Sequence, residues 1–132
     1  MAAYLLVALG SAIGGAARYW CTQVVAERIG ASFPWGTLLV NVCGSLLIGV
    51  LGALSQPNAL WHVSPEARQL LMAGVLGGFT TFSAFSLQTL NLMRDGEWLY
   101  AAANVVASVL VCLLAVWAGF ALAASLAQIR SS

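Results

Sequence analysis

The stretch "GVLGGFTTFSAFS", residues 74–86, lies inside an apolar segment long enough to cross a membrane, yet it lacks the pattern of an uninterrupted helix. Glycines come first, followed by phenylalanines and hydroxyl residues at every third position: Gly74, Gly77 and Gly78, then Phe79, Phe82 and Phe85 beside Thr80, Ser83 and Ser86. Glycine inside a helix costs about 1 kcal/mol relative to alanine. We therefore expect the helix to unwind at the glycines, to free backbone carbonyl groups, and to restart near Thr80 or Thr81.

The composition indicates a membrane protein. The chain has 132 residues, of which 61% are hydrophobic and only 7% are charged. Soluble domains carry about 25% charged residues, so this chain has too few to solvate a globular surface. We expect several spans, the first of them retained rather than cleaved as a signal peptide. A net charge of +1 gives no basis for a nucleic-acid partner.

Four segments have the length and hydropathy of membrane-spanning helices: residues 4–25, 36–54, 68–93 and 98–126. Pro34 suits the start of the second helix and Ser64 the cap of the third. The expected fold class is an all-α membrane protein, in which residues 1–132 form a single four-helix transmembrane domain and the third helix is broken. Small residues at spacings of four predict closely packed helices: Gly10 with Gly14, and Gly74 with Gly78. The three cysteines are expected to be small buried hydrophobic side chains.

The distribution of positive charge predicts dual topology. Four spans place both termini and the second connector on one side of the membrane. The arginines divide almost evenly between the two sides: Arg68 and Arg130 lie on that side, and Arg28 and Arg94 on the other, with Arg18 near the end of the first span. Cytoplasmic segments normally carry an excess of positive residues, and this excess fixes the orientation of a membrane protein. Because neither side of this chain has a clear excess, we expect it to insert both ways up. Four short helices are too few to enclose a polar path, which favours an antiparallel homodimer in lipid.

The titratable groups argue against a proton-coupled exporter and against an enzyme. All the acidic residues fall in connectors or at span ends: Glu27, Glu66, Asp95 and Glu97. A small proton-coupled multidrug exporter is also a four-span, dual-topology dimer, but it needs a titratable carboxylate inside the membrane, so it is the weaker alternative. One histidine and no lysine leave no set of nucleophile and base, and no enzymatic activity is expected.

Neutral hydrogen-bonding side chains recur at spacings of four: Thr37, Asn41 and Ser45 on the second segment, and Asn104, Ser108 and Cys112 on the fourth. One interpretation is interhelical hydrogen bonding in a purely structural membrane partner. Another is a path for a small anion, which hydroxyl and amide donors, a helix N-terminus and the positive edges of phenylalanine rings would stabilise without fixed charge. Carbonyl groups freed by the break would suit a cation.

Three elements of the sequence resemble the Fluc (CrcB) family of fluoride channels and follow one another in the family's order: "GGAARYW" (14–20), "PWGTLLVNVCGSLLIG" (34–49) and the stretch 74–86. The resemblance implies a dual-topology antiparallel homodimer with two fluoride pathways. It further implies passive export of cytoplasmic fluoride across the inner membrane of a prokaryote, which lowers fluoride toxicity. A structural, non-transported sodium ion at the dimer centre is the implied cofactor.

The resemblance also implies roles for particular residues. Backbone carbonyls of Gly77 and Thr80 would hold the sodium ion, and Arg18 would lie near an aqueous vestibule. The fluoride pathway would consist of Asn41, Phe82, Phe85, Ser83, Ser86, Thr37, Ser108 and Asn104. The sequence departs from the family pattern at five positions of the third and fourth helices: Ala84, Gln88, Asn104, Cys112 and Val116. These departures affect the far end of the implied fluoride pathway.

Overall fold

The computed structural model describes residues 1–57, 59 and 63–131, with the side chains of 127–131 excepted. The described residues form helices and no strands, and four helical stretches are long and apolar enough to cross a membrane. Three of these stretches are single helices, which are α1 (Ala2–Ile29), α2 (Trp35–Leu54) and α6 (Trp98–Ser131). The expectation of an all-α protein with four spans is confirmed.

The third span, Pro65–Arg94, consists of several pieces. It runs through α3 (Pro65–Arg68), the π-helix η1 (Gln69–Leu76), α4 (Gly77–Phe79) and α5 (Phe82–Arg94). The expected break is present, but it lies at Thr80 and Thr81, whose backbones are extended (φ −81°, ψ 156° and φ −152°, ψ 116°). The expectation that the glycines unwind is wrong, because Gly74, Gly77 and Gly78 all remain helical.

Local chemistry explains where the helices begin and end. Pro34 precedes the first residue of α2, where its missing N–H costs nothing. The Ser64 hydroxyl accepts a hydrogen bond from the Ala67 N–H at 3.2 Å and caps α3. Gly30 ends α1 with a φ of 101°, a backbone conformation that favours glycine.

Small residues let the helices approach closely, as the spacing predicts. A Cβ atom added at Gly10, Gly14, Gly74 or Gly78 would collide with backbone atoms across the contact between α1 and the first half of the third span. Gly49 of α2 and Gly119 of α6 meet the facing helix's backbone in the same way. Glycine is thus used here for close packing between helices, which is a common device in lipid.

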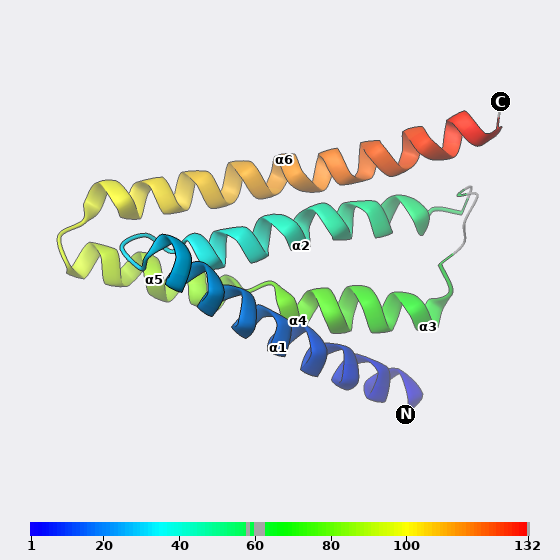
Figure 1. Ribbon diagram of the computed structural model, residues 1–132. Helices are drawn as coiled ribbons and strands as arrows, with labels where there is room; N and C mark the ends of the chain where they lie inside the picture. Colours follow the sequence, from blue (N-terminus) through cyan, green and yellow to red (C-terminus); the bar gives the residue numbers. More distant parts are fainter. Residues whose placement is uncertain (58, 60–62, 132) are drawn as a thin grey trace.

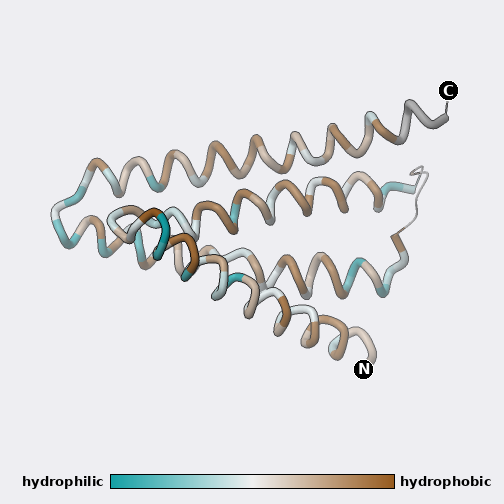
Figure 2. Tube along the Cα trace, in the orientation of Figure 1, coloured by the Kyte–Doolittle hydropathy of each residue, from teal (hydrophilic) through white to brown (hydrophobic). Residues whose placement is uncertain are grey.

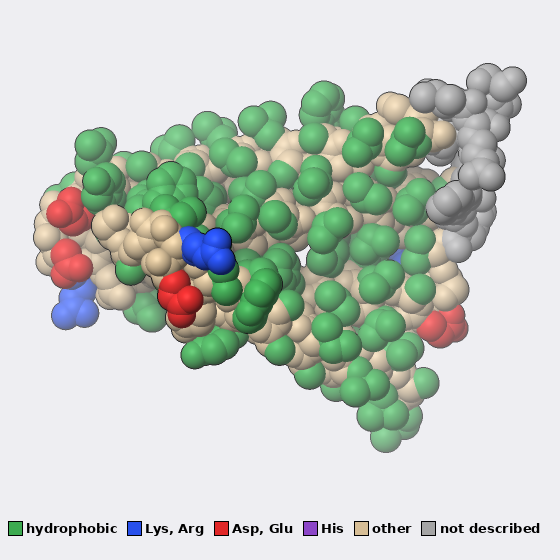
Figure 3. Space-filling model, viewed as in Figure 1, with side chains coloured by type: hydrophobic (Ala, Val, Ile, Leu, Met, Phe, Trp, Pro, Cys, Tyr) green, Lys and Arg blue, Asp and Glu red, His purple; other side chains and the backbone are tan. Residues whose placement is uncertain are grey.

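The helix bundle is apolar along its middle, and its polar and charged residues lie mainly toward its two ends. Figure 1 shows that the start of α1, the end of α2 and the end of α6 lie at one end of the bundle. The turn between α5 and α6 lies at the other end, where hydrophilic colour gathers in Figure 2. The visible face is covered largely by hydrophobic side chains, with the charged side chains mainly toward the ends (Figure 3). This surface suits lipid. The side chain of Arg130, used above to predict orientation, lies outside the described part.

One expectation about buried side chains is wrong. Cys43 is exposed on the surface of the single chain, whereas Cys21 and Cys112 are half-buried, and all three thiols are free. The reason is that Cys43 lies on the opposite side of α2 from the residues that face the third span, so it contributes to the apolar outer surface of this bundle.

Candidate functional site

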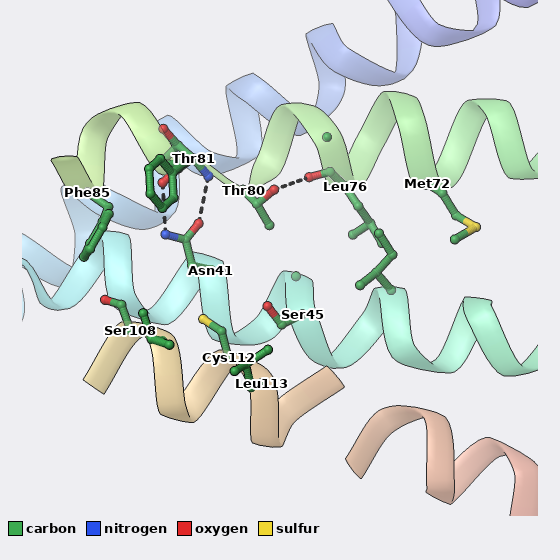
Figure 4. Close-up of a pocket in the computed structure, with 15 residues that line it drawn as sticks. Asn41, Ser45, Met72, Leu76, Thr80, Thr81, Phe85, Ser108, Cys112 and Leu113 are labelled. Carbon is green, nitrogen blue, oxygen red and sulfur yellow. Dashed lines mark hydrogen bonds between the residues drawn. The ribbon is translucent and has the colours of Figure 1, made fainter. Parts of the chain in front are cut away.

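The break in the third span is held by one side chain of α2. The Asn41 side chain accepts a hydrogen bond from the Thr81 N–H through Oδ1 at 2.7 Å and donates one from Nδ2 to the Thr81 carbonyl at 3.0 Å. Figure 4 shows this reciprocal pair facing the break. A backbone that leaves its helix inside a membrane has no water to pair with, so the asparagine supplies both missing partners.

The same hydrogen bonds release two carbonyl groups. In a continuous helix the Thr81 N–H would bond to the carbonyl of Gly77, but here it bonds to Asn41. The Ala84 N–H would likewise bond to the carbonyl of Thr80, but it donates instead to the Thr81 hydroxyl at 3.1 Å and caps α5. The carbonyls of Gly77 and Thr80 therefore each lose the donor that helical geometry would give them.

A cavity of about 440 Å³ lies beside the break. Its walls come from α2, the third span and α6, and none of its lining side chains is charged: Asn41, Gly44, Ser45, Ile48, Met72, Leu76, Gly77, Thr80, Thr81, Phe82, Phe85, Ser108, Val109, Cys112 and Leu113. Figure 4 shows Asn41, Ser45, Ser108 and Cys112 along it. Four of the six polar residues that recur at spacings of four on α2 and α6 thus meet at one cavity, whereas Thr37 and Asn104 do not line it.

Phe82 and Phe85 form the aromatic part of this cavity. Their ring centroids are 5.2 Å apart and their planes are tilted by 50°. Phe85 is 9% exposed, whereas Phe82 is 77% exposed and projects from the chain. The two rings therefore differ in setting, since one is part of the packed wall and the other stands at its outer margin.

A second cavity, of about 500 Å³, lies at the end of the bundle near the turn between α5 and α6. Thr37, Gln88, Asn91, Asp95 and Glu97 are among the residues that line it. The Gln88 Oε1 atom is buried and has no hydrogen-bond partner among the described residues. We call this second cavity the vestibule. Thr37 precedes Asn41 by one helical turn, so one face of α2 runs from the vestibule to the cavity at the break.

Several predicted site residues lie elsewhere. Ser83 is exposed and its hydroxyl is 3.3 Å from the Thr81 hydroxyl, while the Ser86 hydroxyl donates to the Phe82 carbonyl at 2.9 Å. Asn104 is 2% exposed and lines neither cavity. Arg18 also lines neither cavity, although it lies one turn from Thr22, which lines the vestibule.

Sequence reasoning missed the two threonines that organise α5. Thr81 caps that helix and pairs with Asn41, and its signal is a hydroxyl residue directly before an apolar helix. The Thr89 hydroxyl is the buried acceptor for Asn104 at 2.9 Å. Its signal is weaker, since it is only the spacing of four from Phe85 on the same helix face.

The described residues contain no group of three or more His, Cys, Asp and Glu side chains placed to hold a metal ion. What the break offers instead is backbone oxygen, at Gly77 and Thr80. Carbonyl oxygens suit hard cations, so a cation here would be held without any side-chain charge.

These features define a class: a four-span membrane protein whose third span is interrupted beside an uncharged cavity. The chain belongs to the family described as CrcB-like protein, Camphor Resistance (CrcB), which matches residues 5–120. This finding confirms the resemblance seen in the sequence.

Three relatives illustrate the similarity, and each is named fluoride-specific ion channel FluC. The chain is 53% identical over 129 residues to the relative from Methylocella silvestris, with 98% of both chains covered. It is 50% identical over 132 residues to that from Opitutus terrae, with both chains covered completely. It is 56% identical over 119 residues to that from Paramagnetospirillum magneticum, covering 90% of this chain and 93% of the relative. The family consists of channels rather than enzymes, as expected.

The pairing of Asn41 with Thr81 predicts a specific weakness. Asn41→Leu leaves the Thr81 N–H and carbonyl unpaired, so we expect the free energy of unfolding in detergent micelles to fall by about 2 kcal/mol or more. Amide hydrogens of residues 79–84 should also exchange faster by mass spectrometry. Asn91→Leu is the matched control, because the Asn91 side chain is exposed and makes no hydrogen bond within the described part. Unchanged exchange at residues 79–84 would show that Asn41 does not hold the break.

Proposed function

We propose that this chain is a fluoride channel that lets cytoplasmic fluoride leave the cell passively. The observation that carries the proposal is the uncharged cavity at the break in the third span, which combines amide and hydroxyl donors with phenylalanine rings. The names of the relatives from Methylocella silvestris and Opitutus terrae support fluoride as the permeant ion. We assign the channel to the inner membrane of a prokaryote, in agreement with its four candidate spans.

Fluoride binds water strongly, so its path must replace water with hydrogen-bond donors. Asn41 retains one N–H after its pairing with Thr81, and since Asn41 lines the cavity we assign that N–H to the anion. The edges of Phe82 and Phe85 carry partial positive charge and would face the dehydrated ion. Thr37 would donate a hydrogen bond to the anion in the vestibule. Arg18, one helical turn from Thr22 of the vestibule wall, would raise the local concentration of anions.

Ser83, Ser86 and Ser108 complete the proposed pathway. Ser108 lines the cavity directly. Ser83 and Ser86 are exposed on α5 outside this cavity, so we assign them to the part of the path that a second copy of the chain encloses. A negative-inside potential drives the anion outward by about 2.3 kcal/mol per 100 mV, and no proton coupling is needed.

The fluoride proposal is tested by reconstitution. Liposomes loaded with potassium fluoride and carrying the purified protein should release fluoride when valinomycin is added, without any proton gradient. Liposomes loaded with potassium chloride should release little. Release that follows a proton gradient would favour a proton-coupled exporter, and no release from an assembled protein would favour a structural membrane partner.

Phe82→Ile tests the role of the exposed ring in the same liposomes. The substitution removes the positive ring edge, so we expect the fluoride efflux rate to fall by about tenfold or more, with assembly unchanged in size-exclusion chromatography. Phe120→Ile is the matched control, since Phe120 lies on α6 and lines neither cavity. Equal efflux from Phe82→Ile and the unaltered chain would remove Phe82 from the pathway.

We further propose that two copies assemble antiparallel in the membrane. The proposal is supported by the exposure of Phe82 and Gly77 at the break, because a single chain leaves this wall of the path open. It is also supported by the nearly even division of arginines between the two predicted sides of the membrane.

Dual topology predicts that a reporter fused to the C-terminus is active on both sides of the membrane. A reporter that works only inside and one that works only outside should give comparable signals. Arg28→Gln with Arg94→Gln should shift the chain toward C-terminus inside, since Arg68 and Arg130 then remain on the side of the C-terminus and Arg18, within the first span, is the one positive residue left toward the other side. Glu27→Gln with Glu97→Gln is the control, because acidic residues influence orientation little. A signal from one side alone in the unaltered chain would contradict dual topology.

The carbonyls of Gly77 and Thr80 would hold a structural sodium ion where the two copies meet. The support is chemical: both carbonyls lose their helical donors, and both residues line the cavity. When bound, the ion would supply positive charge that fixes the two breaks relative to each other, while Asn41 and Thr81 keep each break open.

Sodium binding predicts a cation-specific change in stability. The midpoint of thermal unfolding should be higher in sodium chloride than in choline chloride of equal ionic strength, because binding at a hundredfold excess over Kd adds about 2.7 kcal/mol. Lithium and potassium chloride serve as controls for size. Identical midpoints and identical fluoride efflux in all four salts would contradict a sodium site.

A further inference from the structure

The most buried polar side chain of the described bundle lies between α5 and α6. Asn104 of α6 is 2% exposed, and its Nδ2 donates to the Thr89 hydroxyl of α5 at 2.9 Å. The Thr89 hydroxyl in turn donates to the carbonyl of Phe85 at 2.8 Å. On the other side of the amide, the Ser108 hydroxyl lies 3.4 Å from Asn104 Oδ1. Three side chains and one carbonyl thus form a continuous buried network.

This network is the link between the two helices. The bond from Asn104 to Thr89 is the one side-chain hydrogen bond between α5 and α6 in the part of the chain that the structure describes. Thr89 follows Phe85 by one turn, and Asn104 precedes Ser108 by one turn. Because the helices run in opposite directions, the Thr89–Asn104 pair lies one turn away from the level of Phe85 and Ser108.

The Thr89–Asn104 pair matters for function because it lies one turn from two residues of the cavity wall. Phe85 and Ser108 both line it, from α5 and α6 respectively, and Figure 4 shows them close to one another. Thr89 and Asn104 do not line it. A hydrogen bond in a low-dielectric surrounding is strong and directional, so it fixes the distance between its two helices. That distance sets the gap between Phe85 and Ser108.

We propose that Asn104 and Thr89 are positioning residues that set the width of the path between Phe85 and Ser108, and that Asn104 does not contact the anion. This inference rests on the fluoride channel proposed above. It replaces the expectation that Asn104 lines the pathway. The Ser108 hydroxyl lies 3.4 Å from Asn104 Oδ1, so the same network also holds the Ser108 side chain in place at the cavity wall.

The test separates positioning from stability by a double substitution. Thr89→Val has nearly the same shape, but it removes both hydrogen bonds of the hydroxyl and leaves the Asn104 amide unpaired. Asn104→Leu removes the other partner. Combined, the two substitutions leave neither an unpaired amide nor an unpaired threonine hydroxyl, and only the Ser108 hydroxyl loses its partner, so the thermal unfolding midpoint of the double variant should return toward that of the unaltered chain.

Fluoride efflux from liposomes should not recover in the double variant, in contrast to its thermal unfolding midpoint. We expect Thr89→Val, Asn104→Leu and the double variant to lower fluoride efflux to a similar extent, by about tenfold, and to lower the ratio of fluoride to chloride efflux. Thr89→Ser keeps the hydroxyl and should restore both. Ser125→Ala is the control, because Ser125 makes the same bond to its own helix, to the Ala121 carbonyl at 2.7 Å, without a partner on another helix.

The outcomes are distinct. A double variant that conducts and selects like the unaltered chain would overturn the positioning role, since the network would then only join the helices. Loss of efflux in Asn104→Leu with normal efflux in Thr89→Val would also overturn it, because Asn104 would then act on the anion directly. No fluoride efflux from the unaltered chain would instead overturn the proposed function itself.

Discussion

The need to pair every backbone group inside a membrane is the constraint on which the structure depends. An extended pair of residues at mid-span is tolerated only if another element supplies a donor and an acceptor together. Asn41 does this with one side chain, since its amide accepts from the Thr81 N–H and donates to the Thr81 carbonyl. A serine or threonine in its place has a single oxygen and reaches both groups less readily, so the position of α2 beside the break follows from this pairing.

Stabilising the break also creates the chemistry beside it. Each N–H that turns toward a side chain leaves a carbonyl without its helical donor, so Asn41 and the Thr81 hydroxyl together account for free oxygens at Gly77 and Thr80. The opening of the helix also creates the N-terminus of α5 at Phe82, and a helix N-terminus carries partial positive charge. Acceptors for a cation and donors for an anion therefore arise from one local interruption, without a charged side chain in the cavity lining.

Much of this arrangement was predictable from sequence. Hydropathy and length predict the four spans, and spacings of four predict that Asn41 with Ser45, and Ser108 with Cys112, share a face of their own helix. That these two faces meet at one cavity is seen only in the structure. The glycines misled, because a glycine that permits unwinding and one that permits close packing have the same local signature. Only the partner distinguishes them, and here Gly74 and Gly78 lie against the backbone of α1. The break instead occurs where Thr81 can both cap α5 and pair with Asn41, and that pairing depends on a contact between residues far apart in the chain.

Asn41 and Asn104 illustrate why spacing alone does not assign a role. Both lie on polar stripes that repeat every four residues, so the sequence treats them alike. Asn41 lines the cavity and meets a backbone that needs one donor and one acceptor, so one of its two N–H groups has no partner there. Asn104 meets Thr89 and Ser108, and it is buried away from the cavity. In lipid a polar side chain bonds to the partners within its reach. The identity of those partners decides whether the residue presents a donor to an ion or fixes the distance between two helices.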